Sequence, residues 1–269
     1  MAATNNAAAA AAATETLPLK DRVAIVTGSS RGIGRDIALH FASLGAKVVV
    51  NYTSPGSSMQ AGKVAAEINS SNPGSAISVR ADISDPDQVK SLFDASEEAF
   101  KLPIYILVNS AGVLNPKYPT IANTSVDDFD KTFSVNVRGA FLCCREATNR
   151  LKRGGGGRII MLTSSSVGSL RPKLSAYTAS KAAVEVMVKI LAKELRGTRI
   201  TANCVAPGPI ATEMFYAGKT EEMINRSIDQ CPQERLGETE DVTPLVGFLA
   251  TDAAEWVNGQ VIRVNGGYV

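Results

Sequence analysis

The sequence predicts an α/β fold: one doubly wound domain in which a seven-stranded parallel sheet is flanked by helices. Seven short runs rich in Val, Ile and Leu recur along the chain, and segments of helical length separate them. These runs are almost continuously apolar, which a parallel sheet buried on both faces requires. A glycine-rich turn follows the first run directly. This alternation favours a single sheet with right-handed crossover connections.

The elements follow in order along the chain. Ser125, followed by two aspartates at 127 and 128, opens a helical segment that runs through Arg150, and Asp85 opens a helix over 86–98. Another helix is expected over 175–196. The glycine run at 153–158 follows a helix and enters a strand, the reverse of the order that phosphate binding needs, so it is predicted to be a flexible turn. The expected strands are residues 22–27, 47–52, 76–80, 105–109, 158–163, 200–205 and 260–264.

The composition favours small-molecule chemistry. The chain has 269 residues, of which 45% are hydrophobic, so it can bury a substantial core. Its 28 basic and 26 acidic residues leave a net charge of +2, unlike the dense positive surface of a nucleic-acid binder. No apolar run reaches the ~18 residues that a membrane span needs. The four cysteines, at 143, 144, 204 and 231, include no C-x-x-C pair, which indicates a reducing compartment. We expect neither nucleic acid nor membrane as a partner.

The first residues differ in composition from the rest of the chain. The segment MAATNNAAAAAAATET is rich in Ala, Asn and Thr without hydrophobic patterning, so residues 1–16 are predicted to be a disordered leader and residues 17–269 the folded domain. Plastid-targeting peptides are similarly poor in acidic residues, but they are usually rich in Arg and Ser, and this segment contains neither. The pattern favours a cytoplasmic protein, with a plastid location as the alternative.

The turn after the first strand has the features of a dinucleotide site. In TGSSRGIGRDIALHF, Gly28, Gly32 and Gly34 let the backbone turn tightly and approach a pyrophosphate, whose charge the free N–H groups of the following helix would meet. The spacing is G-x-x-x-G-x-G, and glycine turns without a ligand are common. The preceding strand and the following helix favour cofactor binding by a Rossmann-like domain.

Two residues near this turn favour NADPH over NADH. Asn51 lies at the end of the second strand, where folds selective for NAD usually place an acid on the ribose 2′-hydroxyl. An absent carboxylate removes repulsion of a 2′-phosphate, and the guanidinium of Arg31 can hold one bidentately. The alternative is that Arg31 only covers the surface of the turn.

Proton transfer is expected from a tyrosine. His40, the only histidine, lies within an expected helix, which leaves serine-histidine triads and His-rich metal sites without their usual residue, and no metal is expected. Tyr177 and Lys181 share one helix face. An ammonium and an oxidised nicotinamide beside the phenol would favour the phenolate and make a tunable acid. In isolation such a pair usually only packs and solvates, but Ser164 precedes it at the sheet edge where ligands of these folds bind.

These residues lie in a series of ordered motifs. The stretches TGSSRGIG, NSAG (109–112), SVNVRGAF (134–141), YTASK and PGPIATEM together resemble the short-chain dehydrogenase/reductase family over about residues 20–269. The resemblance implies that Ser164 hydrogen-bonds the substrate carbonyl and that Tyr177 gives it a proton. It also implies that Lys181 holds the nicotinamide ribose while lowering the pKa of the tyrosine, and that Asn136 anchors a proton-relay water.

The resemblance also implies a set of cofactor contacts. It places Asp82 and Ile83 beside adenine, Asn109, Ala111 and Gly112 along the adenosine ribose and pyrophosphate, and Pro207, Gly208, Ile210 and Thr212 around the nicotinamide. Ser30, Ile33, Tyr52, Tyr177 and Lys181 complete the expected set.

One choice stays open, because Ser165 rivals Ser164 as the catalytic serine. Counting from Arg158 or back from Tyr177 selects Ser164, whereas counting from Gly168 selects Ser165.

The remaining expectations concern substrate and assembly. VVVNY, NRLKRGGGGRII and AVEVMVKILAKEL are similar to plant NADPH-dependent aldehyde reductases, which implies reduction of a small aldehyde or ketone with Tyr177 as proton donor. One alternative is a bulkier ketone or alcohol of specialised metabolism or a β-ketoacyl thioester, and another is a non-catalytic NADP-binding module.

Residues 206–232 are expected to form a substrate lid with a short helix. Within it Met214, Phe215 and Tyr216 suggest an apolar substrate pocket, although packing on neighbouring helices explains them equally well. Relatives pair through two long helices, here 125–150 and 175–196, so the resemblance implies a homo-oligomer, for which a homotetramer is expected and a dimer is the alternative.

Overall fold

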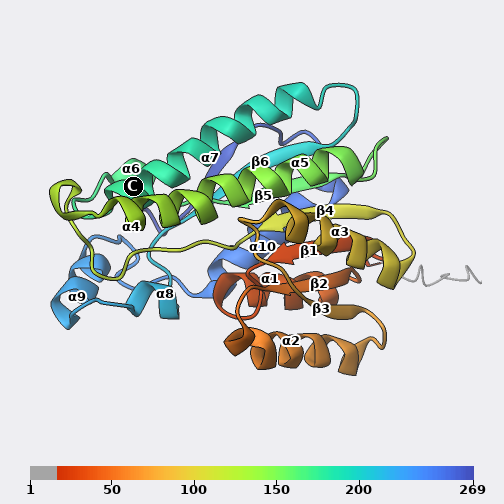
Figure 1. The fold of residues 1–269 in the computed structure, drawn as a ribbon, viewed down its shortest axis with the longest axis horizontal. Helices are drawn as coiled ribbons and strands as arrows, with labels where there is room; N and C mark the ends of the chain where they lie inside the picture. Colours follow the sequence, from red (N-terminus) through yellow and green to blue (C-terminus); the bar gives the residue numbers. More distant parts are fainter. Residues whose placement is uncertain (1–16) are drawn as a thin grey trace, which may run out of the picture.

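The centre of the molecule is a seven-stranded sheet. The computed structural model describes residues 17–269, so the expected leader at residues 1–16 lies outside the described part of the chain. The strands follow the order β3-β2-β1-β4-β5-β6-β7, and each neighbouring pair is parallel (Figure 1). The predicted doubly wound α/β fold is confirmed. The strands are β1 Val23–Thr27, β2 Lys47–Tyr52, β3 Ala76–Arg80, β4 Ile104–Asn109, β5 Arg158–Leu162, β6 Thr201–Pro207 and β7 Val261–Val264.

Helices cover both faces of the sheet, with α1, α2 and α10 on one face and α3, α5 and α7 on the other (Figure 1). Alternate residues of a strand enter the two cores: Ala24 and Val26 of β1 join the first, and Val23 and Ile25 join the second. Burying one such aliphatic side chain stabilises the fold by ~1.5–3 kcal/mol. The six helices are α1 Gly32–Ser43, α2 Ser58–Ser71, α3 Pro86–Phe100, α5 Ala140–Arg150, α7 Ser175–Glu194 and α10 Thr239–Ala250.

The helix starts expected from capping residues are present. Ser125 accepts a hydrogen bond from the backbone N–H of Asp128, and Asp85 accepts from those of Asp87 and Gln88. Each cap satisfies N–H groups that the first turn of a helix leaves without an intrahelical partner. The short elements are η1 Pro55–Ser57, η2 Ile121–Asn123, α4 Val126–Phe133, α6 Ser166–Ser169 and η4 Asp252–Ala254.

The segment expected as one helix over 125–150 is helical throughout but not uniform. Between α4 and α5, residues Ser134–Gly139 form η3, a π-helical stretch. Such bulges inside helices are often found at functional sites. Gly139 ends the stretch against the loop after β3, where an added Cβ would lie 2.8 Å from the side chain of Ile83. The bulge therefore sits directly beside the carboxyl end of the sheet and carries Asn136 there.

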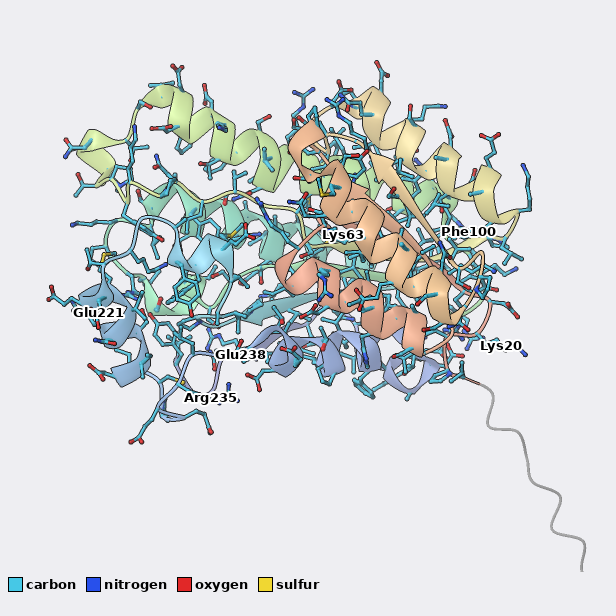
Figure 2. The ribbon with its side chains drawn as sticks, turned by 90° about the horizontal axis from the view of Figure 1, so that it is seen from below. Lys20, Lys63, Phe100, Glu221, Arg235 and Glu238 are labelled. Atoms are coloured by element: carbon cyan, nitrogen blue, oxygen red, sulfur yellow. The ribbon has the colours of Figure 1, made fainter. Side chains whose placement is uncertain are left out.

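The expected lid differs from its prediction in two ways. Its first two residues belong to β6, which extends to Pro207, and the segment contains two helices, α8 Glu213–Tyr216 and α9 Glu221–Asp229. We use "lid segment" for residues 208–232. In Figure 2, Glu221 at the start of α9 lies at one end of the molecule, whereas Lys20, before β1, lies at the other. The lid segment therefore lies beyond the carboxyl ends of the strands.

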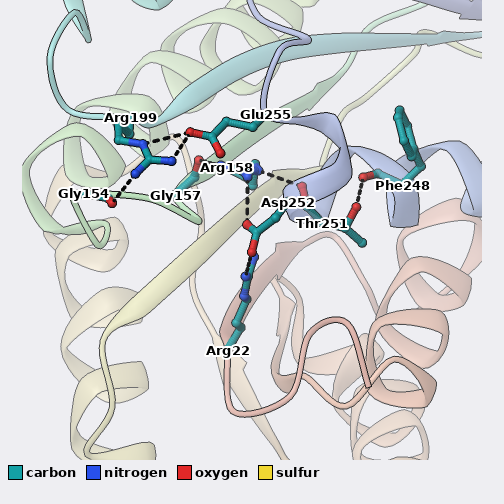
Figure 3. A network of polar contacts seen from close by, with 9 residues as sticks. All are labelled: Arg22, Gly154, Gly157, Arg158, Arg199, Phe248, Thr251, Asp252 and Glu255. Carbon is teal, nitrogen blue, oxygen red and sulfur yellow. Dashed lines mark hydrogen bonds and ion pairs between the residues drawn. The ribbon is translucent and has the colours of Figure 1, made fainter. Parts of the chain in front are cut away.

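A charged network closes the opposite end of the sheet (Figure 3). Arg158 of β5 has 0% of its surface exposed, and its guanidinium donates to the carbonyl oxygen of Thr251 at 3.2 Å. Asp252 pairs with Arg158 at 3.1 Å and with Arg22 at 2.5 Å. The predicted turn at 153–158 borders this network, and its Gly154 carbonyl accepts from Arg199. The glycine run at 153–158 is thus a turn at the amino end of the sheet, far from the glycine turn that follows β1.

Candidate active site

The glycine turn after β1 is built on very close backbone contacts. Gly28 has a φ of 62°, and a Cβ there would lie 2.7 Å from the Cα of Ala111. At Gly34 an added Cβ would lie 2.5 Å from the carbonyl oxygen of Gly28. Any side chain would push these segments apart, so both positions require glycine. Within residues 17–269, the N-cap residue Arg31 makes no side-chain hydrogen bond to the first turn of α1. Its N–H groups are therefore available to an anion such as a pyrophosphate, and the site fits a dinucleotide.

The Asn51 side chain stabilises this turn through hydrogen bonds. Its side-chain oxygen accepts from the N–H of Gly28 at 3.2 Å, and its amide nitrogen donates to the carbonyl oxygen of Ala81 at 3.1 Å. The side chain is 1% exposed. Asn51 therefore braces the turn from inside the protein, and it places no negative charge beside it. The partly exposed Tyr52 and Ser30 flank the same turn.

Arg31 points toward the lid segment. Its guanidinium forms an ion pair with Glu213 of α8 at 3.0 Å, and both side chains are mostly exposed. Beside it, Gly32 faces Thr212, whose methyl group would lie 3.6 Å from an added Cβ. The expected phosphate ligand and the lid segment are thus neighbours. Glu213 was not predicted, because nothing in the linear sequence joins the glycine turn to α8.

The loop after β4 forms the next wall of the cofactor region. The Thr27 hydroxyl donates to the side chain of Asn109 at 2.8 Å and accepts from the N–H of Ala111 at 3.2 Å. At Gly112 an added Cβ would lie 3.3 Å from both Asn136 Oδ1 and Lys181 Nζ. The loop after β4 therefore packs between the glycine turn and α7, the helix that carries Tyr177.

The remaining expected cofactor residues lie around the same edge of the sheet. Asp82 accepts two hydrogen bonds from Ser84, and Ile83 is buried against the π-helical stretch η3. Ile33 packs on the core from the first turn of α1. Their adenine and ribose contacts remain predictions.

The end of β6 supplies the fourth wall. At Gly208 an added Cβ would lie 2.8 Å from the Cα of Asn265, and Pro207 and Ile210 are buried. Thr212 caps α8 by accepting from the N–H of Phe215 at 3.3 Å. The expected nicotinamide residues therefore form a compact turn into the lid segment.

Tyr177, Ser164 and Lys181 come together at this edge. The Ser164 side chain lies close enough to the Tyr177 hydroxyl to influence the pKa of that phenol. The Lys181 ammonium lies 5.8 Å from the centre of the Tyr177 ring and donates to the carbonyl oxygen of Leu162 at 2.9 Å. Two donor hydroxyls and a buried cation thus converge where β5 ends.

The pKa values of this group are set mainly by burial. Burial raises the pKa of Tyr177, and the neighbouring Ser164 hydroxyl opposes that rise. Burial also lowers the pKa of Lys181 to about 8. Burial of the phenol therefore opposes the lowering of its pKa that the resemblance attributes to Lys181, and that lowering remains a prediction. Tyr177 is consequently held in its protonated form at neutral pH.

The two candidate serines have different surroundings. Ser165 is 1% exposed, and its hydroxyl donates to the carbonyl oxygen of Ala206 at 2.9 Å and accepts from Asn265 at 3.0 Å. Ser164 is partly exposed, accepts from the N–H of Ser166 at 3.1 Å and contacts Tyr177. This geometry favours Ser164 for contact with a substrate and gives Ser165 a place in the packing of the C-terminus.

Asn136 links the loop after β4 to the tyrosine helix. Its amide accepts from the N–H of Val113 at 2.8 Å and donates to the carbonyl oxygen of the same residue at 3.0 Å. It also donates to the Ser180 hydroxyl at 3.0 Å, which in turn donates to the Tyr177 carbonyl oxygen at 2.6 Å. Both amide protons are therefore committed within the protein. The water-anchoring role that the resemblance implied would rest on the second lone pair of the oxygen or on the backbone.

The three expected substrate residues lie on α8. Met214 is 43% and Tyr216 45% exposed, and the Phe215 ring packs edge-on against Tyr216. A separate small pocket borders Tyr177, and its lining residues were not predicted: they include Leu114, Asn115, Pro119 and Leu174. These residues come from irregular loops, whose sequence carries no periodic signal.

Two kinds of feature are absent from residues 17–269. No group of His, Cys, Asp or Glu in this part of the chain could hold a metal ion. Likewise, none of its helices combines the length and apolar character needed to cross a membrane.

Known proteins resemble this chain over nearly its whole length. The model of a family described as Enoyl-(Acyl carrier protein) reductase matches residues 28–269. A protein from Arabidopsis thaliana called NADPH-dependent aldehyde reductase-like protein, chloroplastic, is 65% identical over 94% of this chain and 96% of its own length. A Picea abies protein called short-chain type dehydrogenase/reductase is 58% identical over 93% of both chains.

Solved structures agree with these relatives. A short-chain dehydrogenase from Burkholderia cenocepacia, solved in complex with NADP, superposes with a TM-score of 0.86 and 33% identity over 93% of this chain and 99% of that one. Together with the ordered motifs and the sheet described above, these similarities show that the chain belongs to the short-chain dehydrogenase/reductase family of oxidoreductases.

Proposed function

We propose that the protein is an NADPH-dependent carbonyl reductase that acts on an aldehyde or ketone. The observation that carries the proposal is the convergence of Ser164, Tyr177 and Lys181 at the carboxyl edge of the sheet, beside a glycine turn that fits a dinucleotide. The aldehyde reductase-like relative from Arabidopsis supports the choice of substrate class.

The site residues have distinct roles in this reaction. When bound, NADPH supplies the hydride. The hydroxyls of Ser164 and Tyr177 donate hydrogen bonds to the carbonyl oxygen and stabilise the negative charge that develops there. Tyr177, which is protonated before reaction, then delivers its proton to that oxygen, and the buried Lys181 ammonium beside its ring favours the phenolate that remains. Lys181 holds the cofactor ribose, while its bond to Leu162 fixes its position.

The preference for NADPH rests on charge. Asn51 leaves the end of β2 without a carboxylate, and the guanidinium of Arg31 can take a 2′-phosphate in place of Glu213. The NADP-bound structure from Burkholderia supports the same cofactor class.

Tyr177→Phe tests the function directly. The variant keeps the ring and its packing but loses the proton donor, so kcat for aldehyde reduction should fall by about 10²–10⁴. NADPH binding, measured by quenching or enhancement of its fluorescence, should remain. Cofactor binding without turnover of any carbonyl by the natural protein would instead support the non-catalytic module.

An acyl thioester is the second candidate substrate class. The matching family is described as Enoyl-(Acyl carrier protein) reductase, which supports acyl thioesters as a class although the named reaction reduces a C=C bond rather than a ketone. Initial rates of NADPH oxidation with medium-chain aldehydes, a bulky cyclic ketone and acetoacetyl thioesters separate the three substrate types, since the best substrate has the highest kcat/KM.

Assembly and location extend the proposal. Val126 of α4, Phe141 of α5, and Val186 and Ile190 of α7 are large apolar side chains that are about half or more exposed, which supports pairing through these helices in a dimer or tetramer. Light scattering of the purified protein measures the state. The word chloroplastic in the name of the Arabidopsis relative favours the plastid alternative over a cytoplasmic location. A fluorescent fusion of the full chain distinguishes the two.

A further inference from the structure

The lid segment meets the loop after β4 through a contact that leaves no room for a side chain. Gly218 has a φ of 70°, and a Cβ there would lie 1.8 Å from the carbonyl oxygen of Pro116. Two backbones that are far apart in the sequence therefore touch directly. Only glycine permits this approach, so the contact is specific rather than incidental.

Tyr118 fastens the loop side of this contact. It is 8% exposed, and its φ of 48° is a left-handed conformation that costs free energy in a residue other than glycine. Its hydroxyl donates to the carbonyl oxygen of Ala217 at 3.2 Å. The strained backbone thus coincides with a buried aromatic residue whose polar end contacts the lid segment.

Lys219 fastens the lid side. Its ammonium donates to the Tyr118 hydroxyl at 2.8 Å and to the carbonyl oxygen of Phe215. It also lies 3.9 Å from the centre of the Phe215 ring and 5.0 Å from that of Tyr118. Burial, together with the nearby charge of Arg171, lowers the pKa of Lys219 to about 8. One partly buried cation therefore joins two aromatic rings from the two segments.

The loop continues from these contacts into the active site. Its Val113 is held by Asn136, and Gly112 lies against Lys181. Tyr118 is also near enough to Tyr177 to raise the pKa of that phenol electrostatically. The loop that receives the lid segment is therefore the same loop that borders the catalytic tyrosine.

We propose that Tyr118 and Lys219 form a clasp that holds the lid segment shut over the substrate side of the active site. The inference rests on the carbonyl reductase function proposed above and adds two positioning residues to it. Neither residue takes part in proton or hydride transfer. The clasp orients Phe215 and closes the path by which substrate enters and product leaves, so it should affect KM more than kcat.

Three variants test the clasp. Lys219→Met keeps a long side chain without the ammonium, Lys219→Arg keeps the charge, and Tyr118→Phe keeps the ring without the hydroxyl. Lys63→Met, on the exposed surface of α2, is the matched control. Chymotrypsin, which cuts after aromatic residues and not after lysine, reports on the lid segment through cleavage at Phe215 and Tyr216, with the cut sites identified by mass spectrometry.

Lys219→Met and Tyr118→Phe should speed cleavage at these sites and raise KM by about two- to tenfold, the range that one net hydrogen bond corresponds to. Lys219→Arg, which keeps the charge, should have a cleavage rate and a KM close to those of the natural protein. Lys63→Met should change neither the cleavage rate nor KM. Unchanged cleavage and KM in both clasp variants would overturn the proposal. Cleavage does not depend on turnover, so it decides the clasp even if Tyr177→Phe were to disprove the proposed reaction. A variant that fails to fold leaves the other two to decide.

Discussion

Alanine substitution of the two adjacent serines at the end of β5 should separate chemistry from stability. Ser164→Ala removes a partly exposed hydroxyl that contacts Tyr177, so it should lower kcat/KM by about 10²–10³, as loss of one donor to a developing oxyanion does. Ser165→Ala removes a buried hydroxyl that holds Ala206 and Asn265 and that has no path to a substrate.

The magnitude for Ser165 follows from its hydrogen bonds. It makes one bond of 2.9 Å and one of 3.0 Å at 1% exposure, and each is worth about 1 kcal/mol net, so the free energy of unfolding should fall by about 2 kcal/mol. In a domain of this size that loss lowers Tm by about 4–8 °C. Ser164→Ala should change Tm by less than about 2 °C, because only its partly exposed hydroxyl is lost.

The assay pairs thermal unfolding, followed by circular dichroism, with initial rates of NADPH oxidation. The Tm of each variant is measured without ligand, so that substrate binding does not contribute. The reasoning is refuted if Ser165→Ala loses turnover at an unchanged Tm while Ser164→Ala remains active. That pattern would give Ser165 the catalytic role and Ser164 the structural one.

Two further predictions concern charged pairs. Glu213→Gln frees the exposed guanidinium of Arg31, so the Kd for NADPH should fall by about 1.5- to fivefold in a fluorescence titration, as loss of a surface ion pair allows; an equal change for NADH would contradict this. Asp252→Asn leaves the buried Arg158 without a carboxylate and should cost about 1–2 kcal/mol of urea-measured stability at pH 7, because the mostly exposed carboxylate is screened by water. Because Arg22 lowers the pKa of Asp252, the natural carboxylate stabilises fully above its ordinary pKa of about 4 and progressively less as pH falls below it. The difference between the two proteins should therefore narrow in acid, and a constant difference would argue against the ion pairs.

Much of the fold and the centre of the site could be predicted from the sequence. Strands buried on both faces must be apolar throughout, so β2 and β3 have the bounds expected of them. Gly28 and Gly34 could be predicted because only glycine lets two backbone segments approach so closely, and a cluster of glycines after a strand is visible in the sequence. Tyr177 and Lys181 were found because a helix places residues four apart on one face.

The remaining features depend on contacts between distant loops. Glu213, Tyr118 and Lys219 come from segments without periodicity, and no spacing in the sequence connects their partners. The direction of the Tyr177 pKa shift was likewise inaccessible. A motif identifies the neighbouring ammonium, but the dehydration of the phenol depends on everything packed around it.

The π-helical stretch η3 has a consequence for how this chain tolerates insertions and deletions. A π-helical turn holds one more residue than an α-helical turn, so removing one residue from η3 would restore α-helix and keep the phase of α5, whereas adding a residue would rotate α5 by about 100°. Leu142, Cys143 and Ala147, which α5 now buries against the sheet, would swing toward solvent. A surface helix usually accepts such changes near its ends. Here the phase of α5 limits how many residues can lie between Ser134 and Gly139, and engineered variants should not lengthen this stretch even where they change its side chains.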